Sequence, residues 1–341
     1  MAGLNEYLDT PALLLDMGAM EANLARMAAF FANKTAQLRP HFKNHRCIAL
    51  AKRQMAAGAV GMTCATLREA QVLVEHGIPS ILIANEIATQ AKIQHFATLA
   101  PLADVVLAVD NIEVVRELGK YDIPLSVVVD VDVGLGRCGV RSGQEALWLA
   151  QQVIRSGLVF RGLMGYEGRI SSVTACEAAL EKLVACRRLI EQNGITVGTV
   201  TAGGTGSYAI VGQYPGITEV QAGSYIVMDS EYHAICPDFD PVLSVLAAVI
   251  SKTDDRFVVD AGLKSLSSER GVPALKSLPG ARLRKLHAEH GLVDIVDPSL
   301  DLQVGDRIEI AVHYGDATVN LHDRMYGVRG DSVEELFRIE R

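Results

Sequence analysis

The feature that most restricts the fold is a regular alternation of short apolar runs and helical patterns between residues 38 and 221. Predicted strands cover residues 38–42, 60–63, 81–84, 105–109, 125–131, 159–164, 197–201 and 218–221. Helical patterns lie between them, at residues 48–57, 67–76, 89–99, 112–118, 144–155 and 174–193. The strands are rich in Val, Ile and Leu and apolar on both faces, which is typical of a buried parallel sheet. Eight strand–helix units within roughly two hundred residues predict a closed (β/α)8 TIM-type barrel, with a doubly wound open sheet as the alternative.

The sequence changes character after about residue 229. Strand candidates at 241–251, 256–260, 307–312 and 326–329 follow one another without long helices between them. This arrangement predicts a smaller antiparallel β domain at the C-terminal end of the chain. We place the barrel at residues 10–234 and the β domain at 235–341, together with residues 1–9. The apolar run 11–16 predicts a further strand, which could belong to either domain, and a helix follows at 17–33.

Composition excludes several classes of protein. Of the 341 residues, 49% are hydrophobic and 21% charged, which argues against disorder. The net charge of -8 argues against a nucleic-acid or anionic-membrane partner. The six cysteines form no C-x-x-C pair, and we find no secretory signal and no apolar run of membrane-spanning length. We therefore expect a cytoplasmic protein with reduced thiols.

Polar side chains gather where the predicted barrel strands end, which is where barrels of this type carry their functional groups. They are His41, Lys43, Thr63, Cys64, Asn85, Asp130, Asp132, Arg137, Tyr166, Glu167, Arg169 and the turn 202–207. A purely structural barrel does not require so many hydrogen-bonding groups at one end of an apolar sheet. The pattern therefore favours a binding or catalytic site at this end.

Lys43 lies among histidines and arginines in the segment 39–46, where a strand gives way to a helix. Neighbouring cations and partial burial disfavour the ammonium form of a lysine, so that its neutral amine becomes available as a nucleophile. This is the chemistry that a Schiff-base lysine needs. Taken alone, the segment favours a solvated lysine in a turn, and only the rest of the chain favours the nucleophile.

Two glycine- and serine-containing turns follow the last two predicted strands, at 203–207 and 222–225. Such turns have the backbone freedom to surround an anion, and the late loops of a barrel are a common phosphate site. Neither turn has the spacing of a Walker A or dinucleotide fingerprint. Each alone is compatible with an ordinary tight turn, but together they favour phosphate binding.

Two further strand ends leave alternatives open. Arg137 lies in the glycine-framed loop 134–140, where it could face a ligand or pair with Asp130 or Asp132. Tyr166 lies at a strand end in the run 165–168, where it could pack against a flat ligand or simply cover the edge of the core.

Several motifs in this order resemble the D-threonine aldolase and D-serine dehydratase family: PHFKNHR, TCATLREA, GLGRCGV, GYEG, AGGTGSY, EVQAGSY, DAGLKSLS and AEHG. Members are pyridoxal-phosphate enzymes with an alanine-racemase-like barrel and a C-terminal β domain. The resemblance implies that the cofactor is bound by Lys43, as its Schiff-base lysine, and by His41, Arg137, Tyr166, Gly204, Thr205, Gly223, Ser224 and Tyr225. Arg137 matches an arginine that faces the pyridine nitrogen, where a cation makes the cofactor a weaker electron sink.

The sequence departs from the family at two places. Arg169 replaces a histidine that handles a substrate proton. The family also binds a divalent cation through a histidine and, two residues later, an aspartate or cysteine before a Thr-Val-Asn run. Asp316 holds the acidic position here, but Tyr314 holds the histidine position and His313 comes one residue early. We expect His313 and Asp316 to bind Mn²⁺, Zn²⁺ or Mg²⁺, with loss of the metal site as the alternative.

The resemblance implies a lyase that cleaves D-β-hydroxy-α-amino acids, such as D-threonine, to glycine and an aldehyde. Lys43, Tyr166 and Arg169 are the expected catalytic residues. The alternatives are a dehydratase that converts D-serine or 3-hydroxy-D-aspartate to a keto acid and ammonia, an amino-acid racemase, and a non-catalytic cofactor carrier. We also expect a homodimer whose active sites form between the barrel of one subunit and the β domain of the other.

Overall fold

The computed structural model describes residues 8–169 and 172–341. The chain divides into two compact units. The barrel unit comprises Met27–Lys43 and Leu50–Gly223, and the β unit comprises Asn44–Ala49, Ser224–Arg341 and the N-terminal segment up to Arg26. Residues 1–7, which we assigned to the β domain from the sequence, lie outside the described residues. The boundary at residue 235 stays a prediction.

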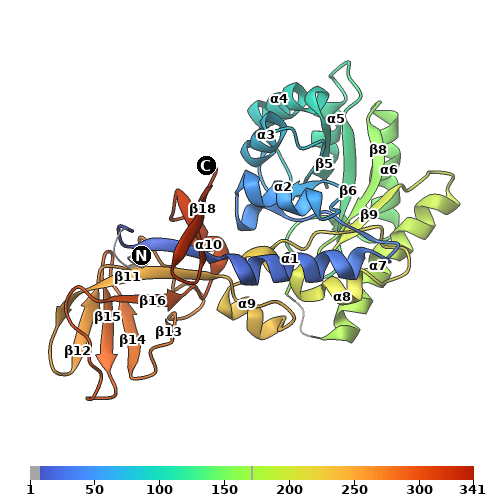
Figure 1. Cartoon of the computed structure of the whole chain (residues 1–341). Helices are drawn as coiled ribbons and strands as arrows, with labels where there is room; N and C mark the ends of the chain where they lie inside the picture. Colours follow the sequence, from blue (N-terminus) through green and yellow to red (C-terminus); the bar gives the residue numbers. More distant parts are fainter. Residues whose placement is uncertain (1–7, 170–171) are drawn as a thin grey trace. The chain divides into compact units, whose positions relative to one another are not determined.

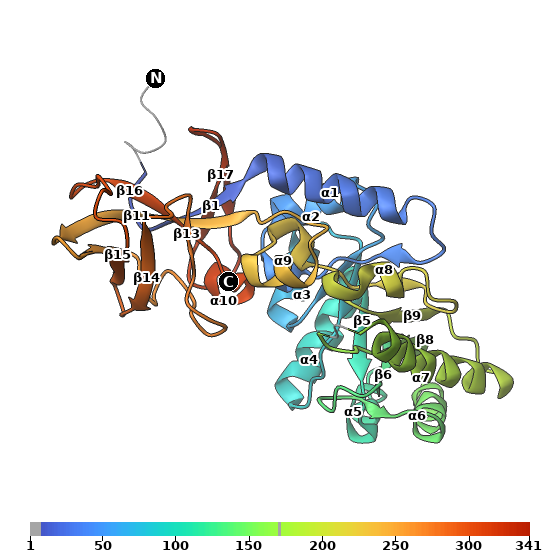
Figure 2. The ribbon, with the colours of Figure 1, turned by 90° about the horizontal axis from the view of Figure 1, so that it is seen from below.

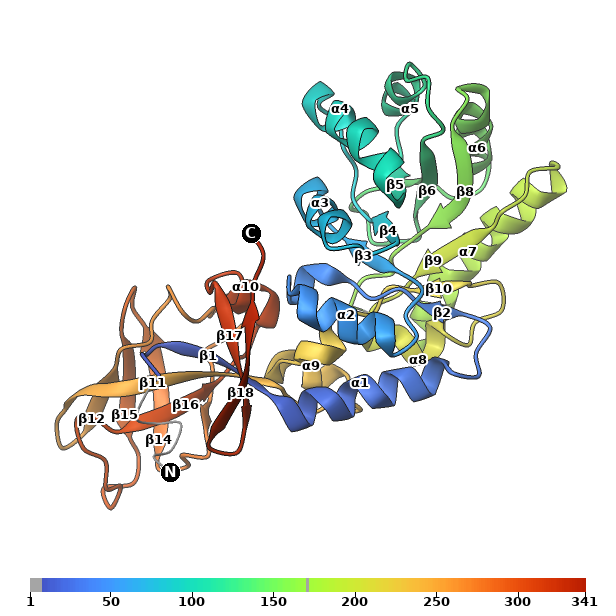
Figure 3. The same cartoon turned by 45° about the horizontal axis from the view of Figure 1, so that its top comes forward.

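Parallel strands form the barrel unit in the order β2-β10-β9-β8-β6-β5-β4-β3 (Figures 1 and 3). Their bounds are β2 Gln37–Leu38, β3 Met62–Cys64, β4 Ser80–Ile83, β5 Asp104–Val109, β6 Ser126–Asp132, β8 Val159–Met164, β9 Thr199–Ala202 and β10 Glu219–Val220. A parallel bridge between His41 and Thr63 joins the two ends of this order, with the Thr63 N–H donating to the Pro40 carbonyl at 2.8 Å. The predicted closed barrel is therefore confirmed, and the short β7 (Val140–Arg141) pairs beside β6.

Helices alternate with the barrel strands and lie outside them (Figure 3). They are α2 Ile48–Ala56, α3 Leu67–Glu75, α4 Gln90–Leu99, α5 Ile112–Leu118, α6 Gln144–Arg155, α7 Val173–Gln192 and α8 Tyr208–Val211, preceded in the chain by α1 Met17–Phe31. Local sequence sets their beginnings. At α3, the side chain of the N-cap residue Thr66 accepts the Glu69 N–H, and the Glu69 carboxylate accepts the N–H of Ala65, the residue before the N-cap. The TCATLREA motif is thus explained as a strand end followed by a capped helix start.

The predicted strand 38–42 is shorter than expected, because β2 ends at Leu38 and a 3-10 helix begins at Phe42. Pro40 has no N–H to continue the ladder. The Arg39 N–H still donates to the Val220 carbonyl at 2.9 Å, so the chain stays aligned with the barrel up to His41. This interruption leaves Lys43 on a helical turn just beyond the barrel wall.

The β unit contains a mainly antiparallel sheet in the order β14-β15-β12-β11-β1-β17-β18, with β13 and β16 joined to it through β11. The strands are β1 Ala12–Asp16, β11 Leu243–Lys252, β12 Arg256–Val259, β13 Leu275–Lys276, β14 Ala281–Leu286, β15 Gly291–Ile295, β16 Arg307–Ala311, β17 Arg324–Arg329 and β18 Ser332–Arg338. Strand β1, which the sequence left open to either domain, pairs with β11 and β17 and so belongs to the sheet of the β unit. Figure 2 shows it beside β11. The unit also contains the helices α9 (Ser230–Ile235) and α10 (Gly315–Val319) and the first part of α1.

Strands β13, β14, β15 and β18 were not predicted, because their charged, half-exposed residues hide the alternation. Two motifs of the sequence meet here. The Leu263 N–H donates to the His287 carbonyl, and a Cβ on Gly262 would lie 2.4 Å from that same oxygen. The DAGLKSLS segment therefore packs backbone to backbone on the AEHG turn between β14 and β15, and this close approach requires glycine.

The barrel interior is apolar in the middle and polar at the end where its strands begin. The apolar cluster consists of Leu82, Val106, Ala108, Val128 and Met164. Ser80 lies two residues before Leu82 and Asp104 two before Val106, so each points to the same face as its apolar neighbour. The alternation of the strands thus places polar groups in the first interior layer.

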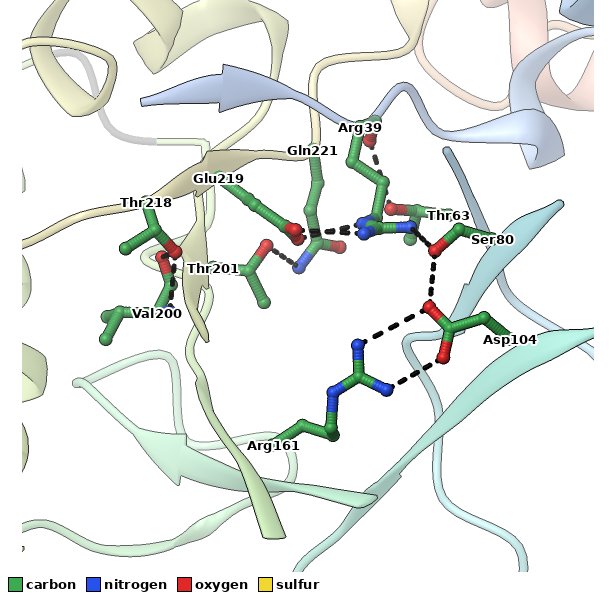
Figure 4. A network of polar contacts seen from close by, with 10 residues as sticks. All are labelled: Arg39, Thr63, Ser80, Asp104, Arg161, Val200, Thr201, Thr218, Glu219 and Gln221. Carbon is green, nitrogen blue, oxygen red and sulfur yellow. Dashed lines mark hydrogen bonds and ion pairs between the residues drawn. The ribbon is translucent and has the colours of Figure 1, made fainter. Parts of the chain in front are cut away.

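A chain of charged and polar side chains fills this first layer (Figure 4). Arg39 binds Glu219 through two hydrogen bonds, Nε to Oε2 at 2.8 Å and Nη2 to Oε1 at 2.9 Å. Arg39 also donates to Ser80 at 3.0 Å, and Ser80 donates to Asp104 at 2.9 Å. Burial alone would raise the pKa of Asp104, but hydrogen bonds from Arg161 and Ser80 lower it. This network lies at the end of the barrel opposite Lys43.

Candidate active site

Lys43 lies on the 3-10 turn Phe42–Asn44 that follows β2. Phe42 is fully buried and anchors the turn, whereas Lys43 is exposed, so the partial burial expected from the sequence is not observed. The Lys43 N–H donates to the His41 ring nitrogen Nδ1 at 3.4 Å. The turn thus fixes the backbone of Lys43 and leaves its amine exposed at the end of the barrel where functional groups gather.

Asn44, the residue after Lys43, joins two segments of the β unit. Its side-chain Nδ2 donates to Ser224 Oγ at 3.0 Å and to Asp316 Oδ1 at 2.5 Å. Asn44 is itself buried. Two predicted site residues, Ser224 and Asp316, are therefore held by the neighbour of the predicted Schiff-base lysine, although they lie far from it in the sequence.

The first glycine turn follows β9 and leads through the 3-10 turn Thr205–Ser207 into α8. Gly203 has φ +79°, and a Cβ there would lie 3.0 Å from Val211, so both the conformation and the space require glycine. The Ser207 hydroxyl donates to the Glu167 carboxyl, and the Gly204 N–H donates to Ser207 Oγ at 3.1 Å. Glu167, which sequence reasoning left without a role, thus holds this turn.

The second turn follows β10, the neighbour of β9 in the barrel. The Gln221 N–H donates to the Ala202 carbonyl at 3.1 Å, which places the run 221–223 beside the end of β9. Ser224 then begins a 3-10 turn in the β unit. The Tyr225 side chain is fully buried, with its ring centroid 5.7 Å from that of Phe239. We therefore expect its backbone, not its ring, to contact a phosphate.

Arg137 and Tyr166 come together at the ends of β6 and β8. The guanidinium carbon of Arg137 lies 5.7 Å from the centroid of the Tyr166 ring, within cation–π range. Asp132, one of the alternative partners of Arg137, accepts the N–H groups of Gly134 and Gly136 at 2.9 and 3.0 Å. These hydrogen bonds shape the glycine loop and lower the pKa of Asp132. The loop therefore presents Arg137 against the tyrosine.

Three carboxyl groups, those of Asp130, Glu86 and Asp110, form a cluster at the end of β6. Only Asp130 was among the predicted strand-end residues. Burial, followed by the charge and hydrogen bond of Glu86 and the charge of Asp110, raises the pKa of Asp130 to about 8. Asp110 also accepts the Gly139 N–H at 3.0 Å. Glu86 and Asp110 follow β4 and β5, so the rule that predicted the other strand-end residues would also have found them. Burial and the neighbouring carboxylates thus favour the protonated form of Asp130, which limits the negative charge of the cluster.

His313, one of the two predicted metal ligands, makes hydrogen bonds within the protein through its ring nitrogens. The His313 ring binds Ser230 Oγ through Nδ1 at 3.1 Å and the Arg270 carbonyl through Nε2 at 3.3 Å. The Arg270 guanidinium lies 5.0 Å from the centroid of the Tyr314 ring. Within residues 8–169 and 172–341, no three His, Cys, Asp or Glu side chains form a group that could hold a metal. Both ring nitrogens of His313 already make hydrogen bonds, and the positive charge of Arg270 lies nearby, so these residues fit a divalent cation poorly.

Asp229 supports this part of the β unit and was not predicted as a functional residue. Its carboxylate accepts the Tyr232 N–H at the start of α9 and the Gly315 N–H at the start of α10, each at 2.6 Å. Burial raises the pKa of Asp229 to about 6 despite these two hydrogen bonds. Asp229 thereby fixes the helix that carries Asp316.

Arg169 is exposed and follows Gly168, whose φ is +85°. Its guanidinium keeps its proton at any physiological pH, so it cannot act as the proton acceptor that a histidine would be. Its chemistry suits the binding of an anion.

Comparison with known proteins places these features in a family. Residues 15–231 match the family described as alanine racemase, N-terminal domain, and residues 242–328 match that described as putative serine dehydratase domain. The chain is 37% identical to D-threonine aldolase from an Arthrobacter species over 97% of its own length and 92% of the relative. It is 30% identical to 3-hydroxy-D-aspartate aldolase from Paracoccus denitrificans, with 99% and 94% covered.

A solved structure agrees with these sequence matches. D-threonine aldolase from Filomicrobium marinum superposes with a TM-score of 0.93 at 36% identity, covering 97% of this chain and 95% of that one. No helix within the described parts of the chain is long and apolar enough to cross a membrane. The barrel, the β unit and both matched domains therefore assign the chain to the D-threonine aldolase and D-serine dehydratase family of pyridoxal-phosphate enzymes with the alanine-racemase fold.

Proposed function

We propose that the protein is a pyridoxal-phosphate-dependent lyase that cleaves D-β-hydroxy-α-amino acids to glycine and an aldehyde. The observation that carries this proposal is the exposed side chain of Lys43, on the turn that follows β2 at the functional end of the barrel. The similarity to D-threonine aldolase and 3-hydroxy-D-aspartate aldolase supports this choice of reaction.

The residues present fit pyridoxal phosphate. An exposed primary amine suits the aldehyde, and the glycine turns after the neighbouring strands β9 and β10 suit the phosphate. Lys43 would hold the aldehyde carbon, Gly204, Thr205, Gly223 and the backbone of Ser224 and Tyr225 would bind the phosphate, and His41, Arg137 and Tyr166 would surround the ring. When bound, the cofactor supplies an electron sink for the bond broken at the substrate α-carbon.

The side chains of the protein divide the remaining work. Lys43 would hold the cofactor, and its amine would also be available to move a proton at the substrate α-carbon. Cleavage also requires a base for the β-hydroxyl proton, and we assign this role to the phenol of Tyr166. Arg137, stacked on Tyr166, holds the phenol in place and keeps a positive charge beside it.

We further propose that Arg169 binds an anionic group of the substrate, since its side chain is exposed and permanently charged. This role favours hydroxyaspartate-like substrates, which carry a second carboxylate. Arg169→Ala should lower kcat/KM for D-3-hydroxyaspartate by about tenfold or more, the loss expected for a charged hydrogen bond. It should leave kcat/KM for D-threonine nearly unchanged. An unaltered preference between the two substrates would remove this role.

The family resemblance implies a divalent metal at His313 and Asp316, which we do not include in the proposed function. The contacts of His313 with Ser230 and Arg270 fit it poorly, and we assign no step of the reaction to a metal.

The alternative function is a dehydratase, favoured by the match of residues 242–328 to the domain described as putative serine dehydratase. In that reaction a base removes the α-proton and the β-hydroxyl leaves, which gives a keto acid and ammonia. Lys43 would then be the α-proton base. The two reactions share the same binding residues and differ in the bond that breaks.

Product analysis separates these functions. The purified protein with added pyridoxal phosphate would be mixed with D-threonine, D-serine or D-3-hydroxyaspartate and followed by NMR. Glycine with an aldehyde supports the lyase, a keto acid with ammonia supports the dehydratase, and the L-enantiomer supports a racemase. Borohydride reduction and peptide mass analysis should place the cofactor on Lys43. Lys43→Ala should abolish turnover, whereas Lys52→Ala, at another exposed lysine, should not.

A further inference from the structure

Glu167 is a buried carboxyl to which the proposed reaction gives no chemical role. It follows Tyr166 at the end of β8 and is only 5% exposed. The Ser207 hydroxyl donates to its Oε1, and a hydrogen bond from the Gly203 backbone also reaches this carboxyl. Its second oxygen, Oε2, is buried without a hydrogen-bond partner among the described residues. Glu167 therefore contacts both the first and the last residue of the turn 203–207.

Ser207 transmits this contact into the turn. Its hydroxyl has one hydrogen, which is directed at Glu167, so its lone pairs accept the Gly204 N–H at 3.1 Å. The Ser207 N–H donates in turn to the Gly204 carbonyl at 3.3 Å. The serine hydroxyl is thus used inside the protein, and a phosphate would be bound by the rest of the turn, whose shape Ser207 maintains.

The charge of Glu167 is compatible with an anion nearby only if the carboxyl is neutral. Burial is the largest effect on this group and raises its pKa, against hydrogen bonds that lower it. A neutral carboxyl can hold the turn without repelling a phosphate dianion.

We propose that Glu167 is a positioning residue that fixes the phosphate-binding turn 203–207 by accepting the hydrogen bond of the Ser207 hydroxyl. This inference rests on the proposed pyridoxal-phosphate function and extends it to the affinity for the phosphate group. Glu167 acts through Ser207 and Gly203, so its removal should weaken phosphate recognition specifically.

The test compares two ligands that differ only in the phosphate. Dissociation constants of pyridoxal phosphate and of pyridoxal would be measured by absorbance for the full-length apoprotein and for Glu167→Ala, Glu167→Gln and Ser207→Ala. Glu167→Ala and Ser207→Ala should weaken pyridoxal phosphate by about tenfold or more, the loss of one or two hydrogen bonds, and pyridoxal by less than about threefold. Glu167→Gln should bind both ligands nearly as the wild type does, because its amide oxygen still accepts the Ser207 hydroxyl.

Glu69 supplies the matched control, because it is also 5% exposed and accepts a backbone N–H, from Ala65 at 2.7 Å. Glu69→Ala should lower the thermal midpoint and leave the ratio of the two dissociation constants unchanged. If Glu167→Ala fails to fold, Ser207→Ala carries the same test.

Equal weakening of both ligands would show a purely structural role and overturn the inference, as would a Glu167→Gln variant as weak as Glu167→Ala. A wild-type protein that binds pyridoxal phosphate through Lys43 while every variant binds it equally well would overturn this inference alone. A wild-type protein that binds no pyridoxal phosphate would overturn the proposed function and this inference with it.

Discussion

Asp130 ends β6 with its carboxyl buried beside the charges of Glu86 and Asp110, and burial is the main reason that its pKa rises to about 8. The ordinary value of 3.8 applies to the unfolded chain. Between these two values the folded protein binds a proton that the unfolded chain does not. The protonated Asp130 carboxyl therefore makes its full contribution to the free energy of unfolding below pH 3.8, and this contribution is lost as the pH rises through about 8.

The substitution Asp130→Asn removes this proton linkage. Relative to the variant, the wild type should lose stability with rising pH, by up to about 1.4 kcal/mol per pH unit between pH 5 and 8. Denaturant unfolding of both proteins at four pH values in this range measures the difference. A difference that stays constant with pH would contradict the raised pKa.

Asp132 provides the control for this experiment, because it lies on the same strand and has the opposite shift. Hydrogen bonds from the backbone of Gly136 and Gly134 lower its pKa. Its contribution is present at neutral pH and is lost as the pH falls through the lowered value. Asp132→Asn should therefore be less stable than the wild type at neutral pH and approach its stability in acid. Asp130→Asn should gain stability relative to the wild type as the pH rises, with the largest gain in mild alkali.

At the scale of the elements, the first interior layer of the barrel depends on an ion pair between β10 and the segment after β2. The side chains of Arg39 and Glu219 are only 10% and 11% exposed. Arg39→Met leaves the Glu219 carboxylate buried without its cation and should cost about 3–5 kcal/mol. The double variant Arg39→Met with Glu219→Leu should recover at least half of this loss. Urea unfolding of the full chain measures both effects.

A more exposed pair in the same network serves as the comparison. The side chains of Arg161 and Asp104 are 38% and 40% exposed, and their oppositely charged groups lie 2.7 Å apart. Arg161→Ala should change the stability by less than about 1 kcal/mol, because solvent screens the pair. Equal losses for Arg39→Met and Arg161→Ala would mean that burial does not set the strength of these contacts.

The contacts of His313, just before α10, bear on whether the reaction requires a metal ion. His313 is engaged by Ser230 and Arg270, and the Arg270 guanidinium stacks on Tyr314. We expect dialysis against EDTA to leave the turnover rate within about twofold of the untreated value, since no step then depends on a Lewis acid. Elemental analysis of the same sample should find less than one metal ion per chain. Activity lost in EDTA and restored by Mn²⁺ would instead establish the predicted His313 and Asp316 site.

A variant that restores the histidine of the family also tests the metal site. Tyr314→His removes the stacking partner of Arg270 and places an imidazole two residues before Asp316, the spacing that the family uses. Histidine nitrogen and carboxylate oxygen suit Mn²⁺. Titration calorimetry should therefore detect tighter Mn²⁺ binding by Tyr314→His than by the wild type. Equal affinities would show that Tyr314 is not what keeps the metal away.

At the scale of the whole molecule, the homodimer expected from the family resemblance is still a prediction. Strand β18 ends the strand order of the β unit and exposes Val333 and Leu336, which are 43% and 55% exposed. Light scattering at micromolar concentration should give a mass twice that of the chain. Specific activity should fall on dilution below the dissociation constant if two subunits share each site. A fully active monomer would contradict both expectations.

Much of the fold followed from local patterns, whereas parts of the site did not. The alternation between residues 38 and 221 predicted each barrel strand, and it placed Lys43, Arg137 and Tyr166 after strands of that barrel. The contact of Glu167 with Ser207 was not predicted, because it joins segments that are separate in the sequence. Strand β14 was missed because alternating charged residues leave only one weakly apolar face.

The sequence by itself determined the periodicity of the elements, the turns and the chemistry of the motifs, since these depend on residues only a few positions apart. Tertiary structure decided how those residues are charged and paired. Arg39 meets Glu219 at a separation of 180 residues, and Asn44 meets Asp316 at a separation of 272. Burial, proton affinity and ion pairing depend on such distant neighbours, because the energy of a charge is set by what surrounds it in space.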